Sequence, residues 1–428
     1  MPTLAPQSAA GAPGRPLAPA AAAHAAPAGS PAARREHPHR PATAAAVPGP
    51  PAGGCAGAAV ATAPSAPPPP PHTPRAICAF EWMRAFAAIA VVLLHTLLAV
   101  VTGFSVEELG LPRAVGDTAV QIALTRWAVP VFLMMSGALL LDPAKRMDGA
   151  KLWRYVRRML LVLATFGLAY CLMEAAFAAL ASGDGLSLGA LPGMLADAVL
   201  ALLEGRSWDH MWYIYALLGL YLITPVLRAF VAQAGERGLR AALLVLFALT
   251  LAVPTVNQAA GLDLETLVWV PCPVFYYLLG YYAFTYLQVN GRVVGVGLAC
   301  LAVMLAGMAW GVATRGDYLF WLWFPEVGSA FMAPYSLLVF LLARRYLERP
   351  LEGHPAVMLL ARYSFGIYLV HPVFLNLLFK AVPLVAPGFG PAALPPGVFE
   401  LLAFAAALGC SVACTWLLRR LPLFRNLV

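Results

Sequence analysis

Apolar stretches of about membrane-spanning length recur along the chain from residue 80 onward, separated by short polar segments. About 20 predominantly apolar residues are enough for a helix to cross a bilayer. Ten stretches approach this length, the eighth being the shortest: 80–101, 119–141, 159–181, 211–231, 239–257, 268–288, 293–313, 328–343, 357–379 and 397–418. The pattern predicts an all-α fold, a polytopic integral membrane bundle of about ten transmembrane helices.

Two segments fall outside this pattern. Residues 1–74 are rich in Pro, Ala and Gly, with scattered Arg and His. Such a composition cannot bury enough apolar surface to fold, so we expect a disordered tail, followed by one transmembrane domain over residues 75–428. The 186–204 stretch contains Pro192, Asp197 and Glu204. It predicts an amphipathic helix on or near the membrane face.

Composition supports a lipid bilayer as the surrounding medium. Of the 428 residues, 61% are hydrophobic and 11% are charged, against about 25% charged in a typical soluble domain. The net charge of +8 lies in loops and is not interleaved with exposed aromatic residues, so nucleic acid is not an expected partner. Most of the seven cysteines fall in apolar stretches, where thiols behave as small hydrophobes. We expect neither a structural disulfide nor a metal site.

Loop charges predict the orientation of the bundle. Every second loop is rich in Lys and Arg, as seen at 142–158, 228–240, 344–349 and 419–425, whereas the intervening loops are acidic or poor in cations. Basic loops face the cytoplasm. We therefore expect both termini to lie in the cytoplasm, in a multi-pass protein of the plasma membrane.

The first apolar stretch, FEWMRAFAAIAVVLLHTLLAVV, contains Arg84 and His95, and ionisable groups are costly in hydrocarbon. Eleven residues at 100° each make three turns plus about 20°, so the two side chains share one stripe, roughly 16 Å apart along the axis. Taken singly, Arg84 could be a snorkelling anchor paired with Glu81, and His95 a packing residue. The aligned pair favours function, with a cation at the entrance and a titratable base further in.

The second stretch contains RWAVPVFLMMSGALLL. Arg126 lies near its outer end, and Pro130 is expected to bend the helix inside the bilayer. Ser136 and Gly137 permit a close approach of another helix. Packing explains these small residues, while Arg126 remains a candidate for substrate binding.

Two later stretches add further ionisable residues. Asp209 and His210 precede the aromatic residues 212–213, which are typical of the membrane interface. Together they are candidates for binding a polar acceptor at the outer mouth. His371 lies in the middle of the ninth stretch and is followed by Pro372, which disfavours helical geometry at His371 and predicts a kink. A buried histidine beside a broken helix indicates a cavity.

These motifs, in this order, resemble the acyltransferase 3 family of bacterial inner-membrane proteins. The first stretch resembles the family pattern of an acidic residue, Arg, ten residues and His, with Glu81 in place of the usual Asp. VPVFLMMSGALLL, HMWYIYALLGLYLITPVL and SFGIYLVHP resemble its second, middle and late signatures. The similarity covers roughly residues 77–425, and its appearance is closest to members that O-acetylate enterobacterial common antigen.

The resemblance implies O-acyl transfer, usually of acetyl, from acetyl-CoA or another acyl-CoA in the cytoplasm to a hydroxyl of a cell-surface polysaccharide or lipid-linked glycan. It implies that His95 is the essential catalytic residue and that Arg84 belongs to the coenzyme site. We add His371 as a second catalytic candidate, and Glu81, Arg154, Arg157 and Arg158 as cofactor-binding candidates. Arg126, Asp209 and His210 remain candidates for substrate binding.

The residues themselves leave other interpretations open. His95 could act as a general base on the acceptor, or carry the acyl group covalently. Broken helices and intramembrane histidines also suit a transporter or flippase for a glycan or small solute, although no internal repeat relates the two halves. A scaffold without activity in a polysaccharide assembly complex is a third possibility. Walker, GxGxxG, HExxH and GxSxG motifs are absent from the sequence.

Overall fold

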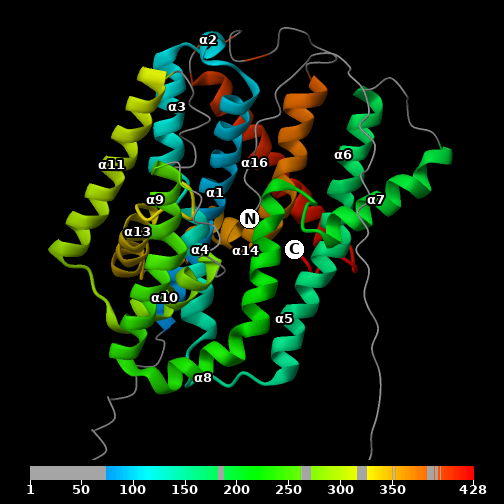
Figure 1. The fold of residues 1–428 in the computed structure, drawn as a ribbon. Helices are drawn as coiled ribbons and strands as arrows, with labels where there is room; N and C mark the ends of the chain where they lie inside the picture. Colours follow the sequence, from blue (N-terminus) through cyan, green and yellow to red (C-terminus); the bar gives the residue numbers. More distant parts are fainter. Residues whose placement is uncertain are drawn as a thin grey trace, which may run out of the picture. The chain divides into compact units, whose positions relative to one another are not determined.

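The first predicted span is one continuous helix, α1 (Pro74–Gly103), which packs against α3, α4, α13, α14 and α16 (Figure 1). The structure is a computed structural model that describes residues 74–428 apart from 182–187, 261, 263–270, 316–324, 349, 352, 383–389, 391–393 and 396. The predicted tail therefore lies outside the described residues, except for Pro74. All described residues belong to one unit, Ser65–Val428.

All regular secondary structure in the described part of the chain is helical. The remaining α-helices are α2 (Val106–Leu109), α3 (Leu111–Leu124), α4 (Ala128–Leu140), α5 (Gly149–Val162), α6 (Leu168–Ala181), α7 (Leu191–Leu203), α8 (Trp212–Phe247), α9 (Val253–Ala260), α10 (Cys272–Tyr286), α11 (Gly291–Arg315), α13 (Met332–Tyr346), α14 (Pro355–Asn376) and α16 (Val398–Leu418). Short π-helical turns are η1 (Leu163–Gly167), η4 (Ala248–Ala252) and η6 (Leu377–Ala381), and 3₁₀ turns are η2 (Leu188–Ala190) and η3 (Asp209–Met211).

The predicted all-α membrane bundle is confirmed. Within the described residues, seven helical segments are long and apolar enough to cross a membrane, judged by length and composition. One of them, Asp209–Ala260, contains two of the predicted spans. These meet at Gly235, whose φ of 59° is open to glycine because it lacks a Cβ, and Figure 1 shows a sharp change of direction within α8. The predicted sixth and eighth spans correspond to α10 and α13, which have only 15 residues each.

The break in the second span lies slightly before the predicted position. Helix α3 ends at Leu124, and α4 starts at Ala128, so Pro130 falls in the first turn of α4. The first four N–H groups of a helix have no partner within it, so a proline costs little there. Arg126 thus lies in the gap between two helices instead of on a bent one.

Helices α4 and α10 approach each other more closely than side chains would allow. A Cβ built on Gly137 would lie 1.8 Å from the carbonyl oxygen of Tyr277, and one built on Gly280 would lie 2.0 Å from that of Met134. Each glycine therefore faces the backbone of the other helix. This confirms the packing role predicted for Gly137, and it places α10 among buried neighbours along most of its length.

We expect Gly137→Ala to destabilise the bundle, because the new methyl group would force α4 and α10 apart. Overpacking of a tight core typically costs about 1–3 kcal/mol. Thermal unfolding in detergent measures the effect. Gly409→Ala on α16 is the matched control, since a Cβ there meets nothing within 4 Å. Equal unfolding midpoints for the two variants would contradict the close approach.

Helix α5 begins ten residues before the predicted start of the third span, because the Asp148 side chain accepts a hydrogen bond from the backbone N–H of Lys151 and caps the helix. Four of the six cations assigned to the 142–158 loop therefore lie on α5: Lys151, Arg154, Arg157 and Arg158. The loop itself is shorter than predicted.

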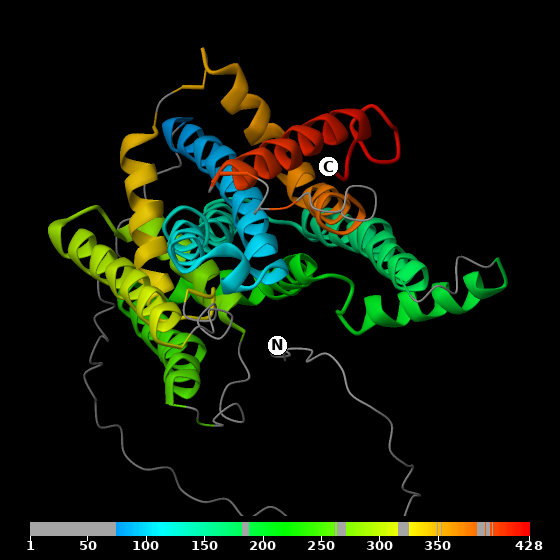
Figure 2. The same ribbon diagram turned by 90° about the horizontal axis from the view of Figure 1, so that it is seen from above.

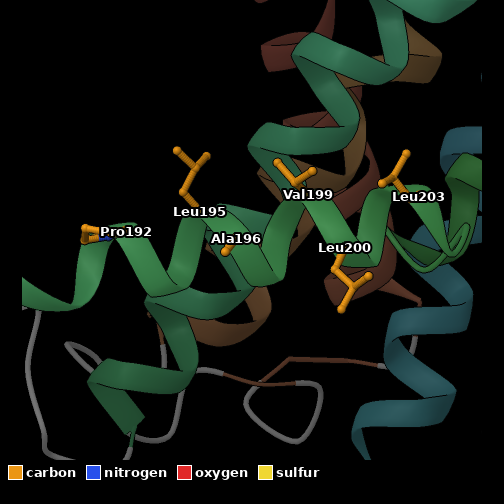
Figure 3. Close-up of a pocket in the computed structure, with 6 residues that line it drawn as sticks. All are labelled: Pro192, Leu195, Ala196, Val199, Leu200 and Leu203. Carbon is orange, nitrogen blue, oxygen red and sulfur yellow. The ribbon is translucent and has the colours of Figure 1, made fainter.

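The segment predicted as an amphipathic helix contains the helix α7, which projects from the side of the bundle in both views (Figures 1 and 2). Its apolar side chains are exposed, with Leu203 at 78% and Leu200 at 53%. A shallow hollow along it is lined by Pro192, Leu195, Ala196, Val199, Leu200 and Leu203 (Figure 3). This apolar surface suits contact with lipid, as expected for a helix at the membrane face.

Candidate active site

Helix α1 carries the first pair of candidate residues. Because it is continuous from Pro74 to Gly103, Arg84 and His95 share one stripe, as their spacing predicts. Arg84 is ion-paired with Glu81 one turn earlier, and both side chains are about one-third exposed. His95 is half-buried. The predicted arrangement of an accessible cation near one end and an imidazole deeper in the bundle is therefore present.

His95 and His371 are hydrogen-bonded to each other across α1 and α14. Nδ1 of His95 lies 3.1 Å from Nε2 of His371 and 2.9 Å from the carbonyl oxygen of Val91. Nδ1 of His371 lies 3.1 Å from the carbonyl oxygen of Ile367. No pattern in the sequence predicts this pairing of two residues 276 positions apart.

The tautomers of both rings follow from these partners. A carbonyl oxygen only accepts hydrogen bonds, so each Nδ1 must carry a hydrogen when the ring is neutral. Nε2 of His371 then carries a lone pair. The Nδ1–H group of His95 donates to this lone pair and to the carbonyl oxygen of Val91 together, in a three-centre hydrogen bond. Nε2 of His95 is consequently left as a free lone pair, the state that a general base requires.

The predicted kink at Pro372 is not observed, because α14 continues through it to Asn376. Pro372 lacks the N–H that would bond to the carbonyl of Tyr368, and α14 continues without this hydrogen bond. His371 keeps helical geometry, and its side chain turns back along α14 to Ile367. Burial of His371 is complete, at 0% exposure.

His210 joins the histidine pair, whereas its neighbour Asp209 does not. The His210 ring centroid lies 5.7 Å from that of His371 and 6.4 Å from that of His95. His210 is 3% exposed, but Asp209 is exposed. The two side chains predicted to act together therefore differ in burial, although both belong to the η3 turn.

The three arginines of α5 that are predicted to bind the cofactor also differ in burial. Arg154 and Arg157 are exposed on α5, but Arg158 is half-buried. Its guanidinium donates to the carbonyl oxygen of Leu427 at 3.1 Å and lies over the Phe365 ring, 4.6 Å from the centroid. Only Arg158 of the three points into the bundle.

Tyrosines on α5, α8 and α14 pack against one another beside these groups, and the sequence does not predict their contacts. The half-buried Tyr221 on α8 has its ring 5.5 Å from that of Tyr155 on α5. Tyr213, predicted to be an interface residue, is 8% exposed and packs against Tyr368 at 5.5 Å. The two contacts join α5 to α8 and α8 to α14 through pairs of tyrosines.

Arg126 lies in the gap between α3 and α4 and is ion-paired with Glu326. It is 6% exposed, and its Nε–H has no hydrogen-bond partner among the described residues. A buried cation with a free donor suits recognition of a polar substrate group.

Apolar hollows on the surface do not contain this site. The hollow along α7 has no candidate residue in its lining. A groove between α1 and α13 is lined by residues such as Phe86, Ala90 and Leu342, on the face of α1 opposite Arg84 and His95. In the described ranges, no group of three or more His, Cys, Asp or Glu side chains is arranged to hold a metal ion.

Comparison with protein-family models gives one match, to a family described as an acyltransferase domain (Acyl_transf_3), over residues 78–420. No curated protein and no solved structure matches the chain. The matched range includes every candidate site residue discussed above and begins four residues after the start of α1.

Proposed function

This chain belongs to the acyltransferase 3 family, and from that membership we propose that it transfers an acyl group, acetyl in the first instance, from cytoplasmic acyl-CoA to a hydroxyl of a cell-surface polysaccharide or lipid-linked glycan. The family makes it a membrane acyltransferase. The donor, the acceptor, and a bacterial plasma-membrane location with both termini in the cytoplasm are our proposal. The observation that supports it most is the free Nε2 lone pair of His95, fixed by His371 and Val91.

In the proposed reaction, Nε2 of His95 takes the proton from the acceptor hydroxyl as its oxygen attacks the thioester carbonyl carbon. The tetrahedral intermediate expels the coenzyme thiolate, which takes the proton back from Nε2 and leaves as the thiol. While His95 is protonated, its Nδ1–H remains bonded to His371 and Val91. His371 is thus a positioning residue, since it holds the tautomer without touching the reacting atoms.

The donor side of the proposed site lies between Arg84 and Arg158. A guanidinium is planar and donates two parallel hydrogen bonds to a phosphate oxygen pair. Both side chains retain this capacity: Arg84 is accessible, and Arg158 is held only by a carbonyl oxygen and an aromatic ring among the interactions described here. Arg154 and Arg157, exposed on α5, would attract the anionic coenzyme without binding it.

Purified protein tests the proposal directly. Acetyl-CoA and a glycan acceptor should give an O-acetylated glycan and free coenzyme A, detected by mass spectrometry and by a thiol assay. A transporter, a flippase or an inactive scaffold would release no thiol. Reporter fusions in the 142–148 loop test the orientation, since a loop outside the cytoplasm would contradict it.

Arg158→Lys and Arg158→Gln test the donor site. Hydrogen bonds to charged groups contribute about 1.5–3 kcal/mol, so we expect KM for acetyl-CoA to rise about 10- to 100-fold in Arg158→Gln and less in Arg158→Lys. Arg157→Gln is the matched control, one position away and exposed, and its KM should stay within about twofold. An equal rise in both Gln variants would mean that only the total charge of α5 matters.

A further inference from the structure

His210 is a buried polar side chain without a polar partner in the described part of the chain. It is 3% exposed, and neither Nδ1 nor Nε2 has a hydrogen-bond partner among the described residues. Leaving a buried donor or acceptor unsatisfied costs about 1–3 kcal/mol, and native proteins seldom do so without a reason. The other two histidines of the site both have partners at Nδ1.

The His210 ring is held firmly in place. Tyr368 donates a hydrogen bond to the backbone carbonyl of His210. The rings of Tyr170 and Tyr368 pack edge-on against it, with centroids 5.0 and 5.3 Å away. Tyr170 is itself anchored, because its hydroxyl donates to the carbonyl oxygen of Leu369 at 2.7 Å. An immobilised imidazole with free nitrogens is preorganised for a ligand.

The position of His210 beside the proposed base indicates the kind of ligand it would take. The His210 and His95 rings are nearly perpendicular, at 79°, with centroids 6.4 Å apart. This separation is too large for a direct hydrogen bond between the rings, so His95 does not satisfy either nitrogen of His210. His371 cannot take the role, since its Nδ1 and Nε2 are both occupied.

We infer that His210 donates its ring N–H to the carbonyl oxygen of the acyl donor and stabilises the negative charge that develops there. The inference rests on the proposed acyl transfer. As the acceptor oxygen bonds to the carbonyl carbon, the carbonyl π-electron pair moves onto its oxygen, which accepts the hydrogen bond from His210. When the carbon–sulfur bond breaks, the pair returns to form the ester carbonyl. His210 keeps its proton throughout, and His95 alone transfers one.

Such a donor acts on the transition state more than on the bound substrate. His210→Leu should therefore lower kcat about 10²-fold or more, while KM for acetyl-CoA stays within about threefold. His210→Gln retains an N–H donor of similar reach and should recover at least tenfold of the loss. His354→Ala, a histidine exposed at the start of α14, is the matched control and should behave as wild type.

The outcomes separate this inference from the proposed function. Absence of transfer by wild-type protein would overturn both. The inference alone is tested when the wild type transfers acetyl and His95→Ala does not. In that case, full activity of His210→Leu overturns the inference, and an equal loss of kcat in His210→Leu and His210→Gln also overturns it. Should His210→Leu fail to fold, the infrared carbonyl stretch of ¹³C-acetyl-CoA bound to wild type decides. A carbonyl stretch at a lower wavenumber than that of ¹³C-acetyl-CoA in water supports the hydrogen bond from His210. A stretch at the same or a higher wavenumber overturns the inference.

Discussion

Replacing His95 with Ala should lower the rate of acetyl transfer by about 10²- to 10⁴-fold, the range expected for loss of a general base. Nε2 of His95 is the free lone pair of the histidine pair, since Nδ1 is committed to His371 and Val91. Initial rates with acetyl-CoA and a glycan acceptor measure the effect. Removing the ring removes the acceptor of the hydroxyl proton, so kcat should fall while KM for acetyl-CoA changes little.

Binding of the donor separates loss of chemistry from loss of fold. Calorimetric titration of His95→Ala with a non-hydrolysable acetyl-CoA analogue should give the wild-type affinity, because Arg84 and Arg158 lie apart from the imidazole. His95→Ala protein that transfers acetyl at the wild-type rate would exclude His95 as the base. A trapped acetyl-histidine in wild type would show that His95 carries the acyl group covalently.

The second large effect concerns stability and lies away from the site. Arg113 on α3 donates through Nε and Nη2 to one carboxylate oxygen of Glu400 on α16, at 2.9 and 2.5 Å. Both side chains are under 10% exposed. Removing one partner of a buried ion pair leaves an uncompensated charge and costs about 3–5 kcal/mol. Arg113→Met should lower the free energy of unfolding in detergent by that amount.

A double substitution removes both charges of the ion pair at once. Arg113→Met/Glu400→Met should recover most of the loss, because an apolar pair of similar volume is often as stable as a buried ion pair. Arg240→Ala is the surface control: its pair with Glu236 is about half exposed on both sides, so the change should stay within about 1 kcal/mol. A comparable loss from Arg240→Ala would mean that burial does not set the cost.

Local periodicity accounts for what the sequence predicts well. The Arg84–His95 stripe depends only on helical geometry within one uninterrupted helix, and the structure keeps α1 continuous. The apolar stretches locate the helices for the same reason. Gly137 could be assigned to close packing because small residues in a membrane helix have few other uses.

Polar groups satisfied by distant partners could not be predicted. The partnership of His95 with His371, and the inclusion of His210 without Asp209, depend on how α1, η3 and α14 pack. The Tyr155–Tyr221 contact likewise requires the arrangement of α5 and α8. In each case the deciding interaction is long-range, and one sequence carries no record of it.

The glycine contact between α4 and α10 also limits how the protein can open. Because Gly137 and Gly280 rest against opposing backbone, neither helix can slide or rotate past the other without a clash between main chains. The two helices behave as a single rigid body. Movements that admit substrates must therefore occur between other pairs of helices. There, side chains rather than main chains separate the helices, and the side chains can change rotamer as the helices move apart.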